Sequence, residues 1–289
     1  MLLTDRAPAK INLTLHVLGR RADGYHRLES LVAFSRSGDT LSLQTGEALS
    51  LATGGPTAPA SGALEDNLVL KAARHLAERV DGVRLGAFHL VKNLPVAAGI
   101  GGGSSDAAAG LRLLARANGL ALDDPRLIEA AAATGSDVPV CLAAKARMMC
   151  GAGEALGPVL DLPPLPVLIV NPRQALATKD VFARMNIKPG SETGFGAHPK
   201  IESGLNFASL IALLKKGRND MEDAACVLVP VVGDVLAIFS AAPGCKLARM
   251  SGSGATCFAI FADCRAVAKA RRSILAAHPN WWAKAAMLN

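Results

Sequence analysis

A glycine-rich loop that leads into a helix-forming segment holds the residues whose types and spacing most clearly imply chemistry. Residues 94–109 read LPVAAGIGGGSSDAAA. Glycines allow positive φ angles and leave no Cβ in the way of a ligand. The start of the following helix presents free N–H groups and the positive end of the helix dipole. Loops of this kind bind phosphate groups, so the sequence predicts a protein that handles a nucleotide.

The spacing of this loop excludes two common phosphate-binding motifs. A Walker A loop needs a Lys-Ser/Thr pair after its last glycine, but Gly103 is followed by Ser104 and Ser105. The dinucleotide fingerprint needs a glycine at its sixth position, which is Ser104 when counted from Gly99. A plain capped helix is the alternative, with Ser104 or Ser105 as the N-cap and Asp106 favoured in the first turn. Four glycines within residues 99–103 exceed what a cap requires, so we favour phosphate binding.

Lys10 and Asn12 form a second candidate site at one end of a predicted strand. Apolar side chains recur at every second position over residues 11–18, a period that predicts a strand with one buried face. Lys10 and Asn12 would share the opposite face, where a lysine beside an amide suits an anionic or polyhydroxylated ligand. A solvated strand end is the alternative interpretation.

Asp137 is the candidate carboxylate of the chain. It lies in the sequence GSDVP, residues 135–139, which ends a predicted helix and precedes an apolar, strand-like run. Carboxylates in such breaks usually cap a helix or face solvent, and that interpretation stays open beside a catalytic one.

The elements that must position these residues follow from patterns along the chain. Asp23-Gly24 is a hairpin-turn signal with a return strand over 26–34. Helices are expected over about 67–80, from the glycine loop to 118, and over 125–133, the last with Pro125 at or near its first position. Residues 167–170 predict a buried strand, and the proline-rich segment 161–166 is the clearest linker. We therefore place a domain boundary near residue 160.

Composition narrows the function classes. The 289 residues, 51% of them hydrophobic, suffice for one large or two ordinary domains. The net charge of +7 comes from dispersed lysines and arginines, so no nucleic-acid partner is expected, while attraction of a phosphorylated substrate is compatible. The six cysteines form no CxxC pair, as expected for reduced thiols, and no zinc site is predicted. Because no signal peptide or membrane-spanning stretch is visible, we expect a soluble, cytoplasmic protein with no membrane partner.

Three motifs resemble those of the GHMP kinases, which phosphorylate small metabolites with ATP. Residues 95–108 resemble the second family motif, usually P-x-x-x-G-L-G-S-S-x-A, although Ile100 replaces the leucine and extra glycines precede the serines. Residues 7–13, APAKINL, resemble the first motif, and residues 250–256, MSGSGAT, resemble the third. The motifs follow the family's order, while the match is loose over about 185–245 and nearly absent over 52–63.

The resemblance implies a fold. We expect an α+β, two-domain GHMP kinase fold, with an N-terminal domain like domain 2 of ribosomal protein S5 and a ferredoxin-like C-terminal domain. The N-terminal, ATP-binding domain would span residues 1–160 and the C-terminal domain residues 161–289. The active site would lie in the cleft between them.

The resemblance also implies a reaction. The GGGSS form of the loop and the segment Gly24-Tyr25-His26 are similar to the family branch that phosphorylates the 2-hydroxyl of 4-diphosphocytidyl-2-C-methyl-D-erythritol, in non-mevalonate isoprenoid biosynthesis. Asp137 would be the general base, assisted by Lys10. Tyr25 would stack on cytosine, His26 would contact its edge, and Phe182 would close the other side of the stack. A core position is the alternative for Phe182.

Further residue roles and partners are implied in the same way. ATP and Mg²⁺ are expected, with Mg²⁺ ligands not identified beyond Ser105 or Asp106 as candidates. An exposed lysine and a helix N-cap remain alternatives for Lys92 and Asn67, and a plain tight turn for the third motif. The partners would be ATP and a cytidine diphosphate-linked polyol, with the protein a monomer or weak homodimer. The ATP-binding residues would be Asn67, Lys92, Pro95, Val96, Ala97, Ala98, Gly99, Ile100, Gly101, Gly102, Gly103, Ser104 and Ser105, and the substrate-binding residues Asn12, Tyr25, His26, Thr178, Phe182, Gly252, Ser253 and Gly254.

Two rival functions remain at this point. Another kinase of the same fold, of the mevalonate or homoserine type, would share the loop and the aspartate, but the Gly24-Tyr25-His26 segment favours a cytidine substrate. A nucleotide-binding module without catalysis would not need both Lys10 and Asp137.

Overall fold

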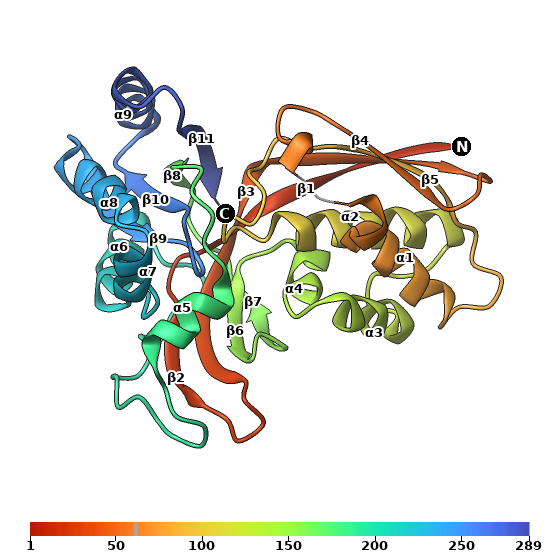
Figure 1. Cartoon of the computed structure of the whole chain (residues 1–289), viewed down its shortest axis with the longest axis horizontal. Coiled ribbons are helices and arrows are strands. Elements are labelled where there is room, and N and C mark those ends of the chain that lie inside the picture. The colour runs from red at the N-terminus through yellow and green to blue at the C-terminus, as the bar shows by residue number, and fades with distance from the viewer. Residues whose placement is uncertain (61–62, 289) are drawn as a thin grey trace. The chain divides into compact units, whose positions relative to one another are not determined.

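The computed structural model describes residues 1–60 and 63–288, and its contacts divide the chain into two compact units (Figure 1). Unit 1 contains Met1–Lys10, Gly38–Val96 and Gly101–Ala144. Unit 2 contains Ile11–Ser37, Ala97–Ile100 and Lys145–Asn289. Each unit contains segments that are distant in sequence. The domain boundary near residue 160 stays a prediction.

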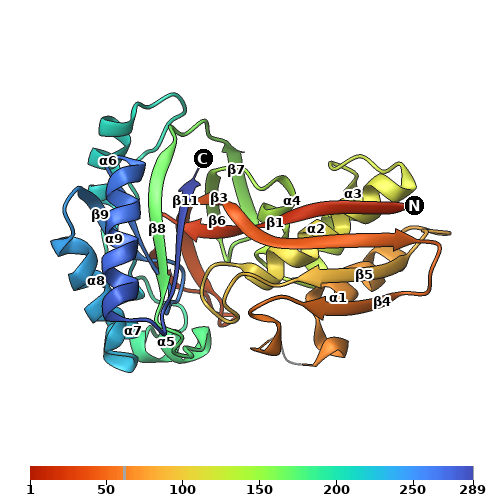
Figure 2. The same cartoon turned by 90° about the horizontal axis from the view of Figure 1, so that it is seen from above.

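Unit 1 is a layer of strands covered by helices (Figures 1 and 2). The second part of β3 (His26–Thr45) pairs antiparallel with β5 (Gly86–Val91), β4 (Ser50–Gly54) pairs parallel with β5, and β1 (Leu2–Asn12) pairs with β3. The helices are α1 (Leu68–Ala77), α2 (Gly102–Asn118), α3 (Pro125–Thr134) and α4 (Val138–Ala143).

Small residues on α2 allow its helix to pack closely in unit 1. A Cβ on Gly110 would lie only 3.3 Å from Val69 Cγ1 of α1 and 3.6 Å from Leu41 Cδ2 of β3. Ala107, Ala108 and Leu111 of the same helix are fully buried. This apolar contact fixes α2, and therefore the glycine loop in front of it, against the strands.

Unit 2 contains an antiparallel group of strands in the order β11–β8–β10–β9, with α6, α7, α8 and α9 on the side shown at the left of Figure 1. All seven residues of β8 are buried. A second group joins β2 and β6 to the first part of β3, and β7 to β6. The elements are β2 (His16–Arg20), β6 (Arg147–Gly151), β7 (Ala155–Val159), β8 (Leu165–Asn171), α5 (Thr178–Met185), α6 (Phe207–Lys216), α7 (Glu222–Leu228), α8 (Val231–Ala241), β9 (Cys245–Met250), β10 (Cys257–Phe261), α9 (Cys264–Ala277) and β11 (Trp282–Leu288).

The expected strand over residues 11–18 is wrong in two respects. β1 ends at Asn12 and β2 begins at His16. Lys10 and all of residues 11–17, Asn12 included, are buried. A strand that is covered on both faces loses its alternation of buried and exposed side chains. The solvated strand end is therefore excluded.

Other boundaries differ by smaller amounts. The return strand predicted over 26–34 continues as β3 to Thr45, and α1 ends at Ala77 rather than near 80. The apolar run after Asp137 is helix α4 and not a strand, because a short apolar run has no period that separates the two and Pro139 is tolerated in a first helical turn. Helices α2 and α3 and strand β8 agree with prediction. No helix among residues 1–60 and 63–288 is long and apolar enough to cross a membrane.

A histidine pair in unit 2, of which His16 is buried, predicts loss of stability in acid. His16 is 0% exposed, and its ring lies 4.6 Å from that of His198. Burial and the nearby Arg218 lower the pKa of His16 to about 3, and burial lowers that of His198. Between pH 6.5 and 3 the unfolded chain therefore binds a proton at His16 that the folded chain does not, so folding stability falls as the pH falls.

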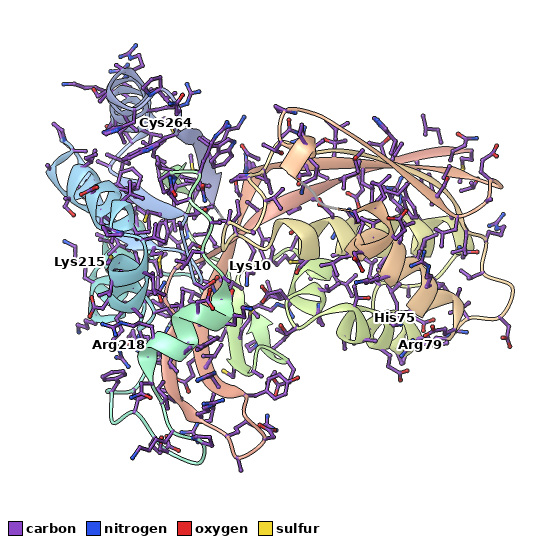
Figure 3. All side chains as sticks on the ribbon, in the orientation of Figure 1. Lys10, His75, Arg79, Lys215, Arg218 and Cys264 are labelled. Carbon is purple, nitrogen blue, oxygen red and sulfur yellow. The ribbon has the colours of Figure 1, made fainter. Side chains whose placement is uncertain are left out.

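Denaturant titrations at pH 7 and pH 5 measure this effect. We expect His16 to account for about 2 kcal/mol of the decrease in the free energy of unfolding. In His16→Asn the decrease should be smaller by that amount, whereas His75→Gln, at a partly exposed position on α1 (Figure 3), should behave as wild type. Equal decreases in all three proteins would contradict the assignment.

Candidate active site

The glycine loop ends at the N-terminus of α2, in the geometry of an anion site. Gly101 is the N-cap residue, with φ 62° and ψ 24°, and the helix begins at Gly102. The serine N-cap alternative is therefore wrong, because Ser104 and Ser105 already lie inside the helix. The first N–H groups of a helix have no acceptor within it, so this helix end can bind phosphate.

The third-motif turn packs directly against the loop within unit 2. A Cβ on Gly99 would lie 2.6 Å from the carbonyl oxygen of Gly254 and 2.7 Å from that of Ser251. A Cβ on Gly252 would lie 2.7 Å from the carbonyl oxygen of Gly99. Ser251 Oγ donates a hydrogen bond to the same oxygen at 3.2 Å. The third-motif turn therefore lies beside the loop, whereas substrate contacts of Gly252, Ser253 and Gly254 stay predictions.

Lys10 and Asp137 form an ion pair in unit 1. Lys10 Nζ lies 2.7 Å from Asp137 Oδ2, and the lysine and aspartate side chains are 5% and 34% exposed. A Cβ on Gly101 would lie 3.2 Å from Lys10 Cβ, so the lysine stem packs against the last residue of the loop. Asp137 is the N-cap residue of α4, but its carboxylate makes no capping hydrogen bond. The carboxylate thus contacts Lys10, with one side open.

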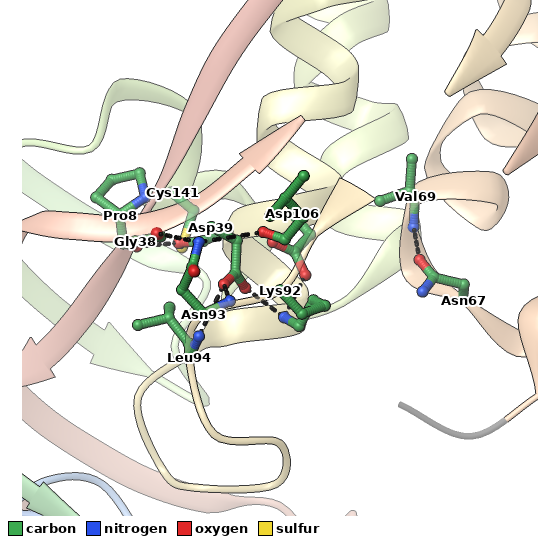
Figure 4. Close-up of polar contacts among 12 residues, drawn as sticks. Pro8, Gly38, Asp39, Asn67, Val69, Lys92, Asn93, Leu94, Asp106 and Cys141 are labelled. Atoms are coloured by element: carbon green, nitrogen blue, oxygen red, sulfur yellow. Dashed lines mark hydrogen bonds and ion pairs between the residues drawn. The ribbon is translucent and has the colours of Figure 1, made fainter. Parts of the chain in front are cut away.

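A buried triad of Asp39, Lys92 and Asp106 lies under the same helix end (Figure 4). The three residues are 1%, 4% and 3% exposed. Lys92 Nζ contacts Asp39 Oδ2 and lies 2.7 Å from Asp106 Oδ2. The exposed-lysine alternative for Lys92 is therefore wrong, and its contact with ATP stays a prediction.

Asp39 also holds the beginning of the loop. Its Oδ1 accepts hydrogen bonds from the backbone N–H groups of Asn93 and Leu94, the latter at 2.8 Å. Burial raises the pKa of Asp106 to about 7, aided by Asp39 and opposed by Lys92. Sequence reasoning missed Asp39, for which the available signal was a lone carboxylate just before the apolar positions Leu41 and Leu43 of a strand.

Two other predicted ATP residues have structural contacts. Asn67 Oδ1 accepts a hydrogen bond from Val69 N at 2.9 Å (Figure 4), so its N-cap interpretation is confirmed. Ser105 is fully buried, and its hydroxyl donates to the carbonyl oxygen of Pro8 at 2.6 Å. Binding of ATP by either residue stays a prediction.

The aromatic cluster of unit 2 consists of Tyr25, His26 and Phe182. Tyr25 is 65% exposed, which leaves its ring open to a ligand. Phe182 stacks on His26, with ring centroids 3.9 Å apart and ring planes 8° from parallel. Phe182 is thus seated against His26, and its place in a stack on cytosine stays a prediction. Burial and Arg20 lower the pKa of His26, so its imidazole is neutral at pH 7 and can both donate and accept.

Asn12 and Thr178 lie on polar networks of unit 2. Asn12 Nδ2 donates to Ser30 Oγ at 2.7 Å, and its backbone N–H donates to Ser251 Oγ at 3.1 Å. Asn12 Oδ1 is buried and has no hydrogen-bond partner among the residues that the structure describes. Thr178 Oγ1 and Ser253 Oγ lie 2.7 Å apart. Asn12 therefore retains an unused acceptor.

Comparison with known proteins decides the family. The model of the GHMP kinases N terminal domain matches residues 67–145, and that of the GHMP kinases C terminal matches residues 203–280. A Methylorubrum extorquens protein named 4-diphosphocytidyl-2-C-methyl-D-erythritol kinase is 57% identical over 97% of this chain and 97% of its own length. The chain belongs to the GHMP kinases. It is therefore a phosphotransferase, as its motifs predict.

Further relatives agree with this family and with the fold. A kinase of the same name from Rhodopseudomonas palustris is 57% identical over 99% of this chain and 95% of its own. The crystal structure of a 4-(cytidine 5'-diphospho)-2C-methyl-D-erythritol kinase has a TM-score of 0.74 and 28% identity over 99% of both chains. Homoserine kinase from Cytophaga hutchinsonii, at 18% identity over 100% of this chain and 94% of its own, has a TM-score of 0.70 and shows the fold alone. The predicted α+β, two-domain GHMP kinase fold is confirmed.

The side chains expected to bind Mg²⁺ in this GHMP kinase do not fit that role. Asp106 is buried and paired with Lys92, and Ser105 is fully buried. Among the described residues, no group of three or more His, Cys, Asp or Glu side chains could hold a metal ion. Magnesium commonly binds through substrate phosphates with few protein ligands.

Proposed function

We propose that this GHMP kinase transfers the γ-phosphate of ATP to the 2-hydroxyl of 4-diphosphocytidyl-2-C-methyl-D-erythritol, a step of non-mevalonate isoprenoid biosynthesis. The observation that carries the proposal is the Lys10 Nζ–Asp137 Oδ2 pair, 2.7 Å apart, whose lysine packs against Gly101 at the N-terminal end of α2. Relatives at 57% identity carry the name of the corresponding kinase, which supports this acceptor.

Asp137 and Lys10 would perform the proton and charge steps. The carboxylate of Asp137 accepts the proton of the acceptor hydroxyl while that oxygen forms a bond to the γ-phosphorus, and the bond between that phosphorus and the oxygen bridging it to ADP breaks. The Lys10 ammonium lowers the pKa of the hydroxyl, orients it and offsets the negative charge that develops. The remainder of the rate enhancement comes from holding the two reactants in line.

The glycine loop and α2 would bind the phosphates of ATP. Free N–H groups at Gly102 and Gly103 and the helix dipole favour the anionic β- and γ-phosphates. Mg²⁺ enters as part of the substrate MgATP, in which it neutralises phosphate charge. The Asp39–Lys92–Asp106 triad is buried, so its role would be to support the loop. The carboxylate of the Lys10–Asp137 pair is partly exposed, so this pair would contact the reacting groups.

Residues of unit 2 would recognise the cytidine end of the acceptor. The exposed ring of Tyr25 offers a stacking face for cytosine. The neutral imidazole of His26 can exchange hydrogen bonds with the base edge. Phe182, stacked on His26, adds an apolar wall to this cluster. A cytoplasmic location and a monomer or weak homodimer remain parts of the proposal.

A coupled ADP-release assay with ATP and Mg²⁺ tests the proposed function. We expect turnover with 4-diphosphocytidyl-2-C-methyl-D-erythritol, and at least about 100-fold lower kcat/KM with 2-C-methyl-D-erythritol 4-phosphate, which lacks the cytidine that Tyr25 would stack on. Mevalonate and homoserine serve as the acceptors of the rival kinases. Preferred turnover of either one would overturn the substrate assignment, and ATP binding without turnover of any acceptor would overturn catalysis.

A further inference from the structure

Ser30 is a buried hydroxyl that joins two residues of unit 2. It is 4% exposed and lies on β3. Its Oγ lies 2.6 Å from the carbonyl oxygen of Thr14 and 2.7 Å from Asn12 Nδ2. No role is assigned to it by any motif of the sequence, yet it touches one of the residues expected to bind the acceptor substrate.

The direction of each hydrogen bond at Ser30 follows from the chemistry of its partners. A serine hydroxyl carries one proton, and a backbone carbonyl can only accept. Ser30 therefore donates its proton to the oxygen of Thr14. It has only lone pairs left for Asn12, so it can be approached by the amide nitrogen and not by the amide oxygen. This contact fixes which end of the Asn12 amide faces Ser30.

Thr14 is itself held in place by its side chain. Its Oγ1 accepts from Leu31 N at 3.0 Å and lies 2.6 Å from His198 Nε2. His198 Nδ1 lies 2.6 Å from the carbonyl oxygen of Pro199 and must donate to it, which leaves Nε2 of the neutral ring as an acceptor for the Thr14 hydroxyl. Every proton in this chain of contacts has one consistent position.

The consequence is that Asn12 Oδ1 points away from Ser30. It is buried without a partner among the described residues, and a Cβ on Gly252 would lie 3.4 Å from it. The backbone of Asn12 is fixed as well, through its N–H bond to Ser251 Oγ. Asn12 therefore presents its free acceptor, Oδ1, on the side of the third-motif turn.

We propose that Ser30 is a positioning residue that sets the polarity of Asn12, so that the acceptor substrate is bound there through a hydroxyl that donates its proton. A phosphate oxygen, which only accepts, is disfavoured at this position. The inference rests on the proposed function for the identity of the ligand, a polyol. The orientation of Asn12 itself does not depend on it.

Kinetics with acceptor analogues test the specificity part of the proposal. In the analogues, the hydroxyl at C1 or C3 of the polyol is replaced by fluorine, which cannot donate. For wild type we expect one analogue to have a KM raised by about tenfold or more. In Ser30→Ala the Asn12 amide can rotate, so the KM for the natural acceptor should rise about tenfold. The KM for the fluorine analogue should then differ from that for the natural acceptor by less than threefold. The KM for ATP should stay within twofold of wild type.

Ser30→Thr and Ser35→Ala are the matched variants. Ser30→Thr keeps the hydroxyl and should restore the discrimination. Ser35 is a buried serine of the same strand whose Oγ accepts from Ser37 N and does not touch Asn12, so Ser35→Ala should discriminate as wild type does. Wild-type discrimination in Ser30→Ala, or the same change in Ser35→Ala, would overturn the proposal.

A ligand-free measurement separates this inference from the proposed function. The side-chain amide signals of Asn12, assigned in an isotope-labelled protein by their loss in Asn12→Asp, should show one proton protected from exchange by Ser30. This protection should be lost in Ser30→Ala and kept in Ser35→Ala. Protection that persists in Ser30→Ala refutes the orientation. Protection lost as expected, in a protein that does not phosphorylate the polyol, would instead refute the proposed substrate.

Discussion

Replacement of Asp137 by asparagine is expected to lower kcat by about 10²- to 10⁴-fold, because the amide cannot accept the proton of the attacking hydroxyl. The side chain is 34% exposed and nearly isosteric with asparagine, so the fold and the affinity for ATP should change little. The coupled ADP-release assay measures kcat, and a thermal melt together with an ATP titration measures folding and nucleotide binding.

Asp123→Asn is the control for this experiment. Asp123 is an exposed aspartate of the same unit, and its variant should keep wild-type turnover. A folded Asp137→Asn protein that turns over within tenfold of wild type would remove this carboxylate from the chemistry. Loss of activity that is matched by loss of ATP binding would instead assign Asp137 a role in shaping the site.

Replacement of Lys92 by methionine is expected to cost about 3–5 kcal/mol of the free energy of unfolding, because it leaves two buried carboxylates without their cation. Asp39 and Asp106 are 1% and 3% exposed, so water cannot take over the role of the ammonium. Denaturant titration measures the loss. The loss should be smaller at pH 5 than at pH 8, because burial raises the pKa of Asp106 to about 7 and its carboxyl loses its charge at the lower pH.

Lys71→Met is the matched control. Lys71 pairs with Asp66 at 3.2 Å, with side chains 43% and 83% exposed, and exposed pairs of this kind contribute about 0–1 kcal/mol. If both variants lost the same stability, or if the loss in Lys92→Met did not depend on pH, the triad would not be held by charge. Because Asp39 also accepts from the N–H of Leu94, we expect the Lys92 variant to bind ATP less tightly.

The elements that sequence predicted best are those encoded by neighbouring residues. Gly101, Gly119 and Pro125 mark the ends of α2 and the beginning of α3 through their own backbone preferences. Strand β1 was less predictable, because burial of Lys10 and Asn12 depends on segments far along the chain. Such packing cannot be predicted from the neighbouring residues alone.

The candidate site divides in the same way. The loop, Lys10 and Asp137 could be predicted from the sequence because each lies in a short, contiguous motif. The contact of Asp39 with Lys92 joins residues 53 apart in sequence, and that of Asn12 with Ser30 joins residues 18 apart. These supporting contacts are set by the strand arrangement, and no spacing rule points to them.

Gly99 lies so close to the carbonyls of Ser251 and Gly254 that the glycine loop cannot be transplanted into another protein without them. The hydrogen bond between Ser251 and Gly99 joins positions 152 apart in sequence. The conformation of residues 94–109 therefore depends also on the third-motif turn, residues 250–256. A fragment or a chimera that contains residues 94–109 without residues 250–256 would keep the glycine motif and lose its conformation.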